Sequence, residues 1–260
     1  MIIAMKRSGI WIAALALSMG SGTAMAQLTA NASVTNNYLW RGLTQSLNQP
    51  AVQGGMDWSS DSGFYVGTWV SNVEYAPGDP YSYEHDIYFG YSGESGDMTY
   101  DFGWLYYNYD ALADIDFHEI YGTLGFGGFS ATAYLLGGTE AKESAYESDF
   151  AVTGADFGFG EAYYLSLDYE FETESGLVVG LHAGHHDGDF MTWFNFAIDS
   201  YTDYAVSFSI DNFTFTISDT GLDSVDPSGL SAPFSSGLDI STNDNGEPKF
   251  VLSYSVDFEL

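Results

Sequence analysis

Seven charged residues occupy positions at which their side chains could interact with a solute: Arg41, Asp101, Asp168, Glu170, Glu172, Asp211 and Asp257. The acids alternate with apolar residues, so in a closed sheet they face the interior or lie at its ends. Inward placement is favoured because a charge facing lipid costs about 2–4 kcal/mol for Arg or Lys at the bilayer midplane, and less for an acid. Acids that line a confined passage attract cations and exclude anions. The alternative is that they are solvated acids inside a narrow, filled barrel.

The segment HAGHHDGD, residues 182–189, holds three histidines and two aspartates, which are ligand types for zinc. On a strand, His182 and His186 share one face and His185 takes the other, so only part of the set can converge. We interpret these residues as polar side chains at a strand end. The acidic segment 239–247 lacks the ligand spacing of an EF-hand calcium loop. The sequence therefore predicts neither a metal site nor a cofactor.

Catalytic signatures are absent from the sequence, which has no G-x-S-x-G, no H-E-x-x-H and no cysteine. A Ser/His pair could be assembled from His118 or His182 and one of many serines. Such common residues carry no signal without a characteristic spacing. We predict that the protein is not an enzyme.

Residues 1–26 are predicted to form a cleavable signal peptide. Lys6 and Arg7 precede an apolar run over residues 10–19, and Ala24-Met25-Ala26 gives the small-x-small cleavage pattern. The apolar run is shorter than the roughly 20 residues that cross a bilayer core of about 30 Å, although an uncleaved anchor is the alternative. The mature chain, residues 27–260, is predicted to be a single outer-membrane β-barrel.

The chain is strongly acidic, with 5 Lys and Arg against 36 Asp and Glu and a formal net charge of −31. Two of the five basic residues and none of the acids lie in residues 1–26, so the mature chain carries 3 − 36 = −33. This charge excludes electrostatic binding of nucleic acid and binding of anionic lipid through a basic patch. Adaptation to a saline habitat would give the same composition. Without cysteine, stability must come from packing, backbone pairing or a membrane rather than from disulfides.

Alternation of apolar and polar residues recurs along the chain, most clearly over residues 252–260. The chain has 17% aromatic residues and 30 glycines, which suits many short strands better than helices. Twelve strands are predicted, over residues 29–40, 51–60, 63–73, 83–94, 98–109, 116–127, 129–136, 162–172, 177–185, 202–211, 213–219 and 249–260. The segment 190–199 also alternates and could replace one of them.

The connections between these strands alternate in length. Every second connection is a turn of a few residues, such as 61–62 and 95–97, whereas the others reach about 25 residues at 137–161 and nearly 30 at 220–248. A transmembrane β-barrel sorts its loops in this way, and the alternative, a soluble acidic β-sandwich, has no reason to do so. In lipid every backbone group must be paired, so a strand protein has to close on itself. We therefore predict an all-β fold, a transmembrane antiparallel β-barrel of about 12 strands.

The run NNYLWRGLTQSLNQPAVQGGMDW, followed by GFYVGTWVSNVE, resembles the opening of the TorF-type porin family. The matching residues are Asn37, Tyr38, Arg41, Gly42, Gln45, Pro50, Ala51, Gln53, Gly54, Gly55, Gly63, Tyr65, Gly67, Trp69, Ser71 and Asn72. The resemblance is specific in this first part and continues in strand layout to the C-terminus. It implies an exported outer-membrane barrel of gram-negative bacteria, which the barrel assembly machinery would insert.

Arg41 is predicted to end the first strand, beside Tyr38 and Trp40 in an interfacial aromatic girdle. A guanidinium can stack on aromatic rings and pair bidentately with a carboxylate. Arg41 therefore either ties the first loop to interior acids and fixes the mouth of the barrel, or acts as a selectivity element facing acids across a pore.

Together these features predict a passive outer-membrane pore for small hydrophilic solutes, with a preference for cations. Its expected partners are outer-membrane lipid, small solutes or cations and the assembly machinery, but no nucleic acid. A non-conducting barrel with a binding or structural role is the alternative. The sequence leaves the solute and the oligomeric state open.

Overall fold

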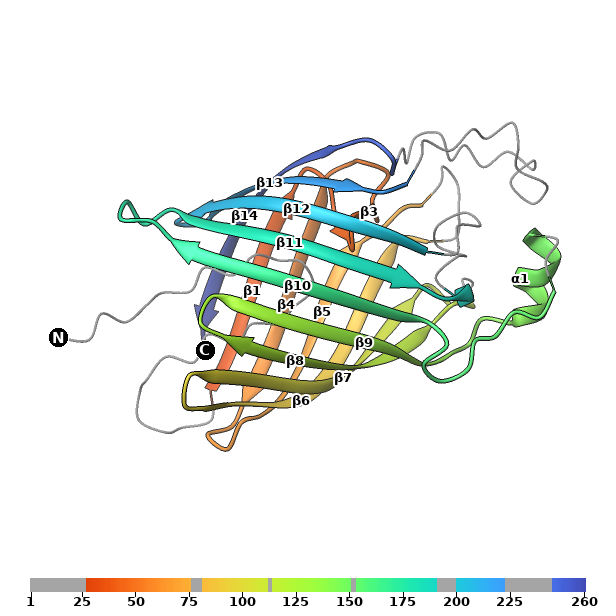
Figure 1. Ribbon diagram of the computed structural model, residues 1–260, viewed down its shortest axis with the longest axis horizontal. Helices are drawn as coiled ribbons and strands as arrows, with labels where there is room; N and C mark the ends of the chain where they lie inside the picture. Colours follow the sequence, from red (N-terminus) through yellow and green to blue (C-terminus); the bar gives the residue numbers. More distant parts are fainter. Residues whose placement is uncertain (1–26, 76–80, 112–113, 151–152, 191–199, 223–244) are drawn as a thin grey trace.

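A computed structural model describes residues 27–75, 81–111, 114–150, 153–190, 200–222 and 245–260. Within these residues, twelve antiparallel strands close into a barrel in which β1 pairs with both β4 and β14 (Figure 1). The wall consists of β1 (Gln27–Thr35), β4 (Ala51–Ser59), β5 (Phe64–Asn72), β6 (Tyr83–Ser95), β7 (Met98–Tyr109), β8 (Phe117–Phe126), β9 (Phe129–Thr139), β10 (Tyr163–Glu172), β11 (Val178–Asp187), β12 (Ser200–Ile210), β13 (Phe213–Thr220) and β14 (Lys249–Glu259). The predicted fold class and strand number are confirmed. The predicted signal peptide lies outside the described residues, as does nearly all of the segment 190–199.

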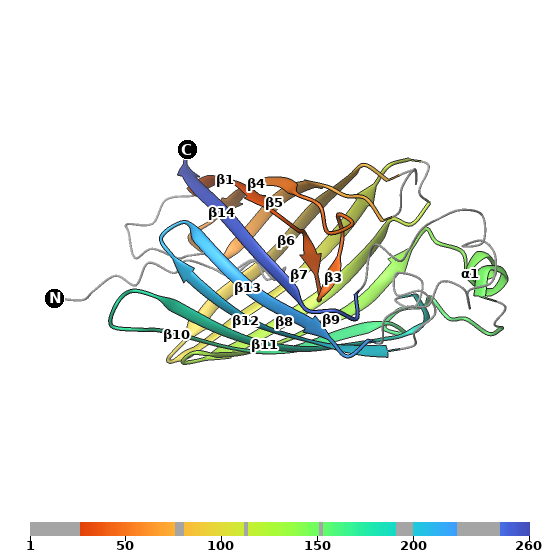
Figure 2. The ribbon, with the colours of Figure 1, turned by 90° about the horizontal axis from the view of Figure 1, so that it is seen from above.

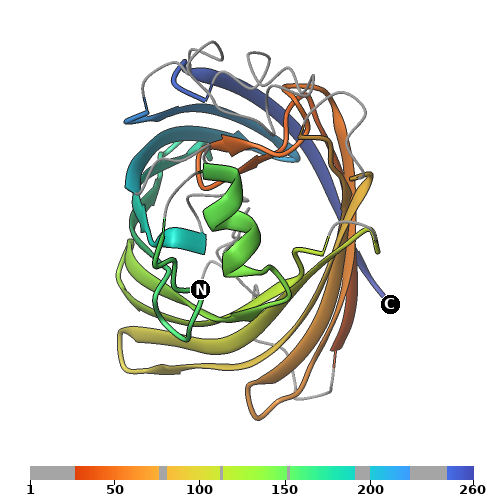
Figure 3. The ribbon, with the colours of Figure 1, turned by 90° about the vertical axis from the view of Figure 1, so that its right-hand side faces the viewer.

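The connections are sorted by length between the two ends of the barrel (Figure 1). The tight turns lie at one end, the turn end, where Asp211 and Asn212 alone join β12 to β13. The long connections lie at the other end, the loop end. One of them carries α1 (Glu143–Phe150), which lies across the barrel opening in the view along the axis (Figure 3). The predicted alternation of connection lengths is therefore confirmed.

Among the described residues, no helix is both long and apolar enough to span a membrane.

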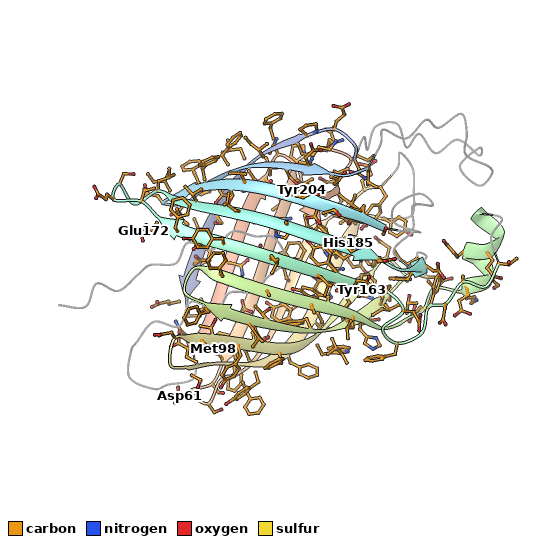
Figure 4. All side chains as sticks on the ribbon, viewed as in Figure 1. Asp61, Met98, Tyr163, Glu172, His185 and Tyr204 are labelled. Atoms are coloured by element: carbon orange, nitrogen blue, oxygen red, sulfur yellow. The ribbon has the colours of Figure 1, made fainter. Side chains whose placement is uncertain are left out.

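The outward face of the wall is apolar along every strand. Val52 and Leu167 are 68% and 67% exposed, and each of the twelve strands contributes at least one large exposed apolar side chain. Figure 4 shows Met98, Tyr163 and Tyr204 on this outer surface, and acidic Asp61 and Glu172 at the turn end. A closed barrel with such a surface lets strands cross a bilayer without exposing unpaired backbone groups to lipid.

Glycines and tyrosines interlock on the inward face of the wall. A Cβ atom placed on Gly103 would lie 2.6 Å from ring atoms of Tyr121 on the neighbouring strand. Gly184 is covered in the same way by Tyr164. Glycine in a strand marks such a close approach, because any side chain would occupy the space of the ring. This packing accounts for part of the high glycine and tyrosine content of the chain.

The first strand ends five residues before the predicted boundary. β1 stops at Thr35, and the chain turns into the barrel as a hairpin of β2 (Leu39–Trp40) and β3 (Leu43–Thr44) (Figure 2). At its tip, Arg41 and Gly42 have φ values of 49° and 81°, the positive values that a two-residue type I′ turn requires. We call residues 36–50 the inner hairpin.

The predicted aromatic girdle at the end of the first strand is wrong. Trp40 is only 5% exposed and packs in the buried aromatic cluster inside the barrel. The hydroxyl of Tyr38 donates a hydrogen bond to Glu84 on the inward face of β6. The physical reason is that the chain leaves the wall after Thr35, so these rings line the interior rather than the outer surface.

Candidate functional site

The guanidinium of Arg41, at the tip of the inner hairpin, is enclosed by one carboxylate and three aromatic rings. Its Nη1 and Nη2 atoms donate to Oε1 and Oε2 of Glu119 on β8, at 3.0 and 2.6 Å. Its Cζ atom lies 4.2 Å from the ring centroid of Trp40, 4.7 Å from that of Tyr134 and 4.4 Å from that of Tyr164. We call these four residues the arginine cage. Bidentate pairing and ring stacking are both interactions for which arginine is suited better than lysine.

The arginine cage keeps its cation charged although it excludes water. Arg41 and Glu119 retain 2% and 1% of their side-chain exposure. Burial is the largest single influence and lowers the pKa of Arg41, but the Glu119 carboxylate, together with Tyr107 and Tyr134, raises it by more in total, so that the pKa lies above its ordinary value. A buried pair of opposite charges satisfies both partners, whereas either one alone would be left uncompensated. The pair therefore fixes the hairpin tip against β8.

Further polar contacts orient both members of this pair. Nε2 of His186 on β11 lies 3.2 Å from Nη1 of Arg41 and accepts its hydrogen bond, since a guanidinium can only donate. The hydroxyl of Tyr201 donates to the backbone oxygen of Arg41 at 3.0 Å. The hydroxyl of Tyr107 donates to Oε2 of Glu119, also at 3.0 Å. Strands β7, β8, β11 and β12 thus all hold the tip.

The base of the inner hairpin is fixed as well. The hydroxyl of Thr44 donates to Oδ1 of Asn37 at 2.7 Å, which closes the hairpin across its two arms. The backbone N–H of Thr44 donates to Oδ1 of Asn245, just before β14. Asn245 in turn accepts from the hydroxyl of Thr220 at the end of β13. Because tip and base are tied to different strands, the hairpin has a defined position across the barrel interior.

A second polar cluster lies on the inward face of β10 to β12. Nδ1 of His182 lies 2.6 Å from Oδ1 of Asp168, and Nε2 lies 2.9 Å from Oδ1 of Asp203. The hydroxyl of Tyr164 reaches the same Asp203 carboxylate at 3.1–3.2 Å. With a carboxylate beside each ring nitrogen, the arrangement suits an imidazole that donates from both. This cluster adjoins the arginine cage through Tyr164.

The histidine segment divides between the two faces of β11, as predicted. His182 and His186 face inward, whereas His185 takes the other face and is only partly buried. The two inward histidines have different partners. His182 contacts Asp168 and Asp203, whereas His186 contacts Arg41. In the part of the chain that the structure describes, no group of three or more His, Asp or Glu residues is placed to hold a metal ion. Of the segment 239–247, the described residues begin at Asn245.

The seven residues singled out from the sequence do not form one site. Asp101 faces inward and accepts a hydrogen bond from Tyr65 at 2.6 Å, and Tyr65 also contacts the hydroxyl of Tyr121. Asp168 lies in the second polar cluster, beside His182, and Glu170 follows it on the same face of β10. The other three acids lie toward the turn end: Glu172 at the end of β10, Asp211 in the β12–β13 turn and Asp257 near the end of β14.

Four buried acids that contact or surround these clusters were not singled out from the sequence: Glu84, Asp86, Glu119 and Asp203. The sequence feature that could have identified them as inward residues is the period-two pattern. Along β6, for example, Glu84, Asp86 and Tyr88 alternate with outward residues. That pattern gives the face of each residue but not its partner on another strand. Arg41 and Glu119 are 78 residues apart in the sequence, so their pairing could be recognised only from the structure.

The barrel interior differs between its two ends. Toward the turn end many inward side chains are small, polar and partly exposed, among them Asn31, Thr123, Ser130, Thr214, Thr216 and Ser255, although the buried Tyr65 also lies there. We call the part of the interior that these polar side chains line the vestibule. Toward the loop end the inner hairpin meets a buried aromatic cluster that includes Tyr107 at 2% and Phe117 at 1% exposure. The hairpin therefore fills much of the interior on the loop side.

Residues 20–228 match the family model described as a bacterial protein of unknown function, Gcw_chp. The chain belongs to this family. None of the curated proteins matches it. Because the Gcw_chp description assigns no function, the resemblance to TorF-type porins stays a prediction.

Among solved structures, the chain is similar to the KdgM porin, with 6% identity and a TM-score of 0.48 over 90% of this chain and 99% of that one. It is similar to the NanC porin at 10% identity and a TM-score of 0.45, covering 90% and 100% of the two chains. It is similar to OccD1 at 11% identity and a TM-score of 0.37, covering 90% of this chain and 66% of that one. One structure of KdgM contains disordered oligogalacturonate. At these identities and TM-scores, the likenesses do not determine a solute or a charge preference for this chain.

Proposed function

We propose that the protein is an outer-membrane porin through which small hydrophilic solutes diffuse passively, with a preference for cations. The observation that carries this proposal is the charge of the barrel interior. In the described residues, twelve acids fall at inward positions of the wall strands: Asp57, Glu84, Asp86, Glu94, Asp101, Glu119, Asp168, Glu170, Glu172, Asp203, Asp257 and Glu259. Two basic residues, Arg41 and Lys249, stand against them.

This excess of acids lowers the electrostatic potential along the interior, which concentrates cations and repels anions. Arg41 does not reverse the effect, because its charge is paired with Glu119. The apolar outer surface fits a lipid environment, and short turns on the periplasmic side would be usual for an outer-membrane barrel. In this proposal the polar side chains of the vestibule would line the solute path as far as the inner hairpin, which would set the narrowest section.

Conductance in planar bilayers tests the proposal. The purified protein is expected to give ion-conducting steps, and a KCl gradient is expected to give a reversal potential of the sign for cation selectivity. Asp57 and Asp101 both face the vestibule, so the double variant D57N/D101N should reduce that potential. The control D61N alters an acid in an exposed turn and should leave it nearly unchanged. Absence of conductance, or anion selectivity, would contradict the proposal.

A second candidate is a non-conducting barrel with a binding or structural role. The observation that favours it is the buried aromatic cluster around the inner hairpin, which fills the interior on the loop side. The same bilayer measurement separates the two candidates. A correctly folded protein that inserts into bilayers and passes no ions would support this second reading.

A further inference from the structure

One buried carboxylate beneath the inner hairpin has no hydrogen-bond partner on one of its oxygens. Asp86 on β6 faces inward and is 8% exposed. Its Oδ1 atom is sealed from solvent and has no partner in the part of the chain that the structure describes. A buried carboxylate oxygen in this state is unfavourable, and native structures usually pair such atoms with a donor, a water or an ion.

The immediate neighbours of Asp86 are also buried acids. Glu84 lies two residues earlier on the same face, and Glu119 lies on β8, both with 1% exposure. The charge of Asp86 interacts with both. Arg41 pairs with Glu119 and is the one basic side chain in contact with this group among the described residues. Because Arg41 pairs with Glu119, neither Glu84 nor Asp86 has a basic partner among the described residues.

The tyrosines around Asp86 cannot balance it, because their hydroxyls are directed to other acids. Tyr38 and Tyr109 donate to Glu84, Tyr107 donates to Glu119, and Tyr88 donates to Asp57. Across the sheet, Asp86 is in register with Trp69 on one side and Tyr107 on the other. The surroundings of Asp86 are therefore acidic and aromatic, with the local hydroxyl donors already used.

This environment distinguishes between kinds of cation. Calcium takes six to eight oxygen ligands and magnesium six, and no described group of three acids is placed to hold a metal ion. An alkylammonium can form a strong ionic hydrogen bond to a carboxylate and gains further attraction from aromatic rings. We propose that Asp86 binds the ammonium group of a small primary amine beneath the inner hairpin. This inference rests on the proposed cation preference and names the class of solute.

The inner hairpin would cover the bound amine. The ring of Tyr38 packs edge-on against Trp69 with centroids 5.4 Å apart, while its hydroxyl holds Glu84. A cation at Asp86 would relieve the repulsion among the acids below this cover. Binding should therefore stabilise the folded barrel by mass action.

Calorimetric titration of the detergent-solubilised protein with ethylammonium chloride tests the site, with sodium chloride at equal ionic strength as the reference. The unmodified protein is expected to bind ethylammonium saturably, and D86N about tenfold or more weakly, because an ionic hydrogen bond is lost. The control D61N removes an acid from an exposed turn, and it should bind as the unmodified protein does. The thermal unfolding midpoint should rise with ethylammonium in the unmodified protein and in D61N, but not in D86N.

Equal binding by D86N and the unmodified protein would overturn the assignment, and so would an equal response to sodium. Conductance in KCl is measured in parallel on the same preparations. Asp86-dependent binding without conductance would support the amine site and contradict the proposed porin function. Conductance without Asp86-dependent binding would overturn the amine site alone.

Discussion

Arg41 occupies a backbone conformation that only glycine adopts easily. Its φ of 49° lies in the left-handed region, where a non-glycine residue costs on the order of 1–3 kcal/mol. The conformation persists because the surrounding groups determine it: a carboxylate, three rings and a hydrogen bond to its own backbone oxygen. Strain of this kind, combined with complete enclosure, indicates that the hairpin tip is held in place by the side chain of Arg41.

Removing one member of the Arg41–Glu119 pair should destabilise the barrel more than removing both. R41Q leaves the Glu119 carboxylate buried without a counter-charge, and a loss of about 3–5 kcal/mol in the free energy of unfolding is expected. R41Q/E119Q removes both charges and should lose clearly less. The measurement is urea unfolding from lipid vesicles followed by tryptophan fluorescence. The control K142Q changes an exposed lysine and should have no effect. Equal losses in the single and double variants would contradict the role of the pair.

At the scale of elements, the wall could be predicted from the sequence and the inner hairpin could not. Alternation identifies a strand because successive side chains must face opposite surroundings, and this holds for all twelve wall strands. The inner hairpin has only two paired residues on each side. Its turn is Arg-Gly rather than the Asn-Gly or Asp-Gly that signals a type I′ turn, so alternation simply appeared to continue from Thr35 to Trp40. The faces of His182 and His186 were predictable, but their partners depend on the register of neighbouring strands.

The interlock of glycine and tyrosine between neighbouring strands should be sensitive to a single methyl group. In G103A the new Cβ would lie 2.6 Å from the ring of Tyr121, so the ring or the backbone must shift. We expect a loss of about 1–3 kcal/mol, the usual effect of overpacking. In the control G221A, the new Cβ would lie 3.6 Å from its nearest neighbour, and the effect should be near zero. Urea unfolding midpoints of the two variants, compared with the unmodified barrel, provide the measurement. A G103A barrel as stable as the G221A barrel would contradict the interlock.

For the molecule as a whole, the interior of the barrel depends on where one loop folds. The strand pattern specifies a polar and aromatic interior, but it does not state whether a connection enters that interior. The inner hairpin does so because a carboxylate on β8 and rings on β9 and β10 offer Arg41 a site that solvent and lipid do not. A sequence with the same twelve strands and no such arginine could enclose an open channel.

Salt should separate the electrostatic contribution of the vestibule from that of the buried groups. Exposed charges are screened over about 10 Å at 0.1 M ionic strength and about 3 Å at 1 M, whereas buried pairs are screened much less. The vestibule acids face wetted space, so the reversal potential at a fixed KCl ratio should fall toward zero as the mean concentration rises from about 0.1 M to about 1 M. D57N/D101N should start from a smaller potential and change less. A reversal potential that stays constant over this range would place the selectivity at the sealed acids beneath the inner hairpin instead of the vestibule.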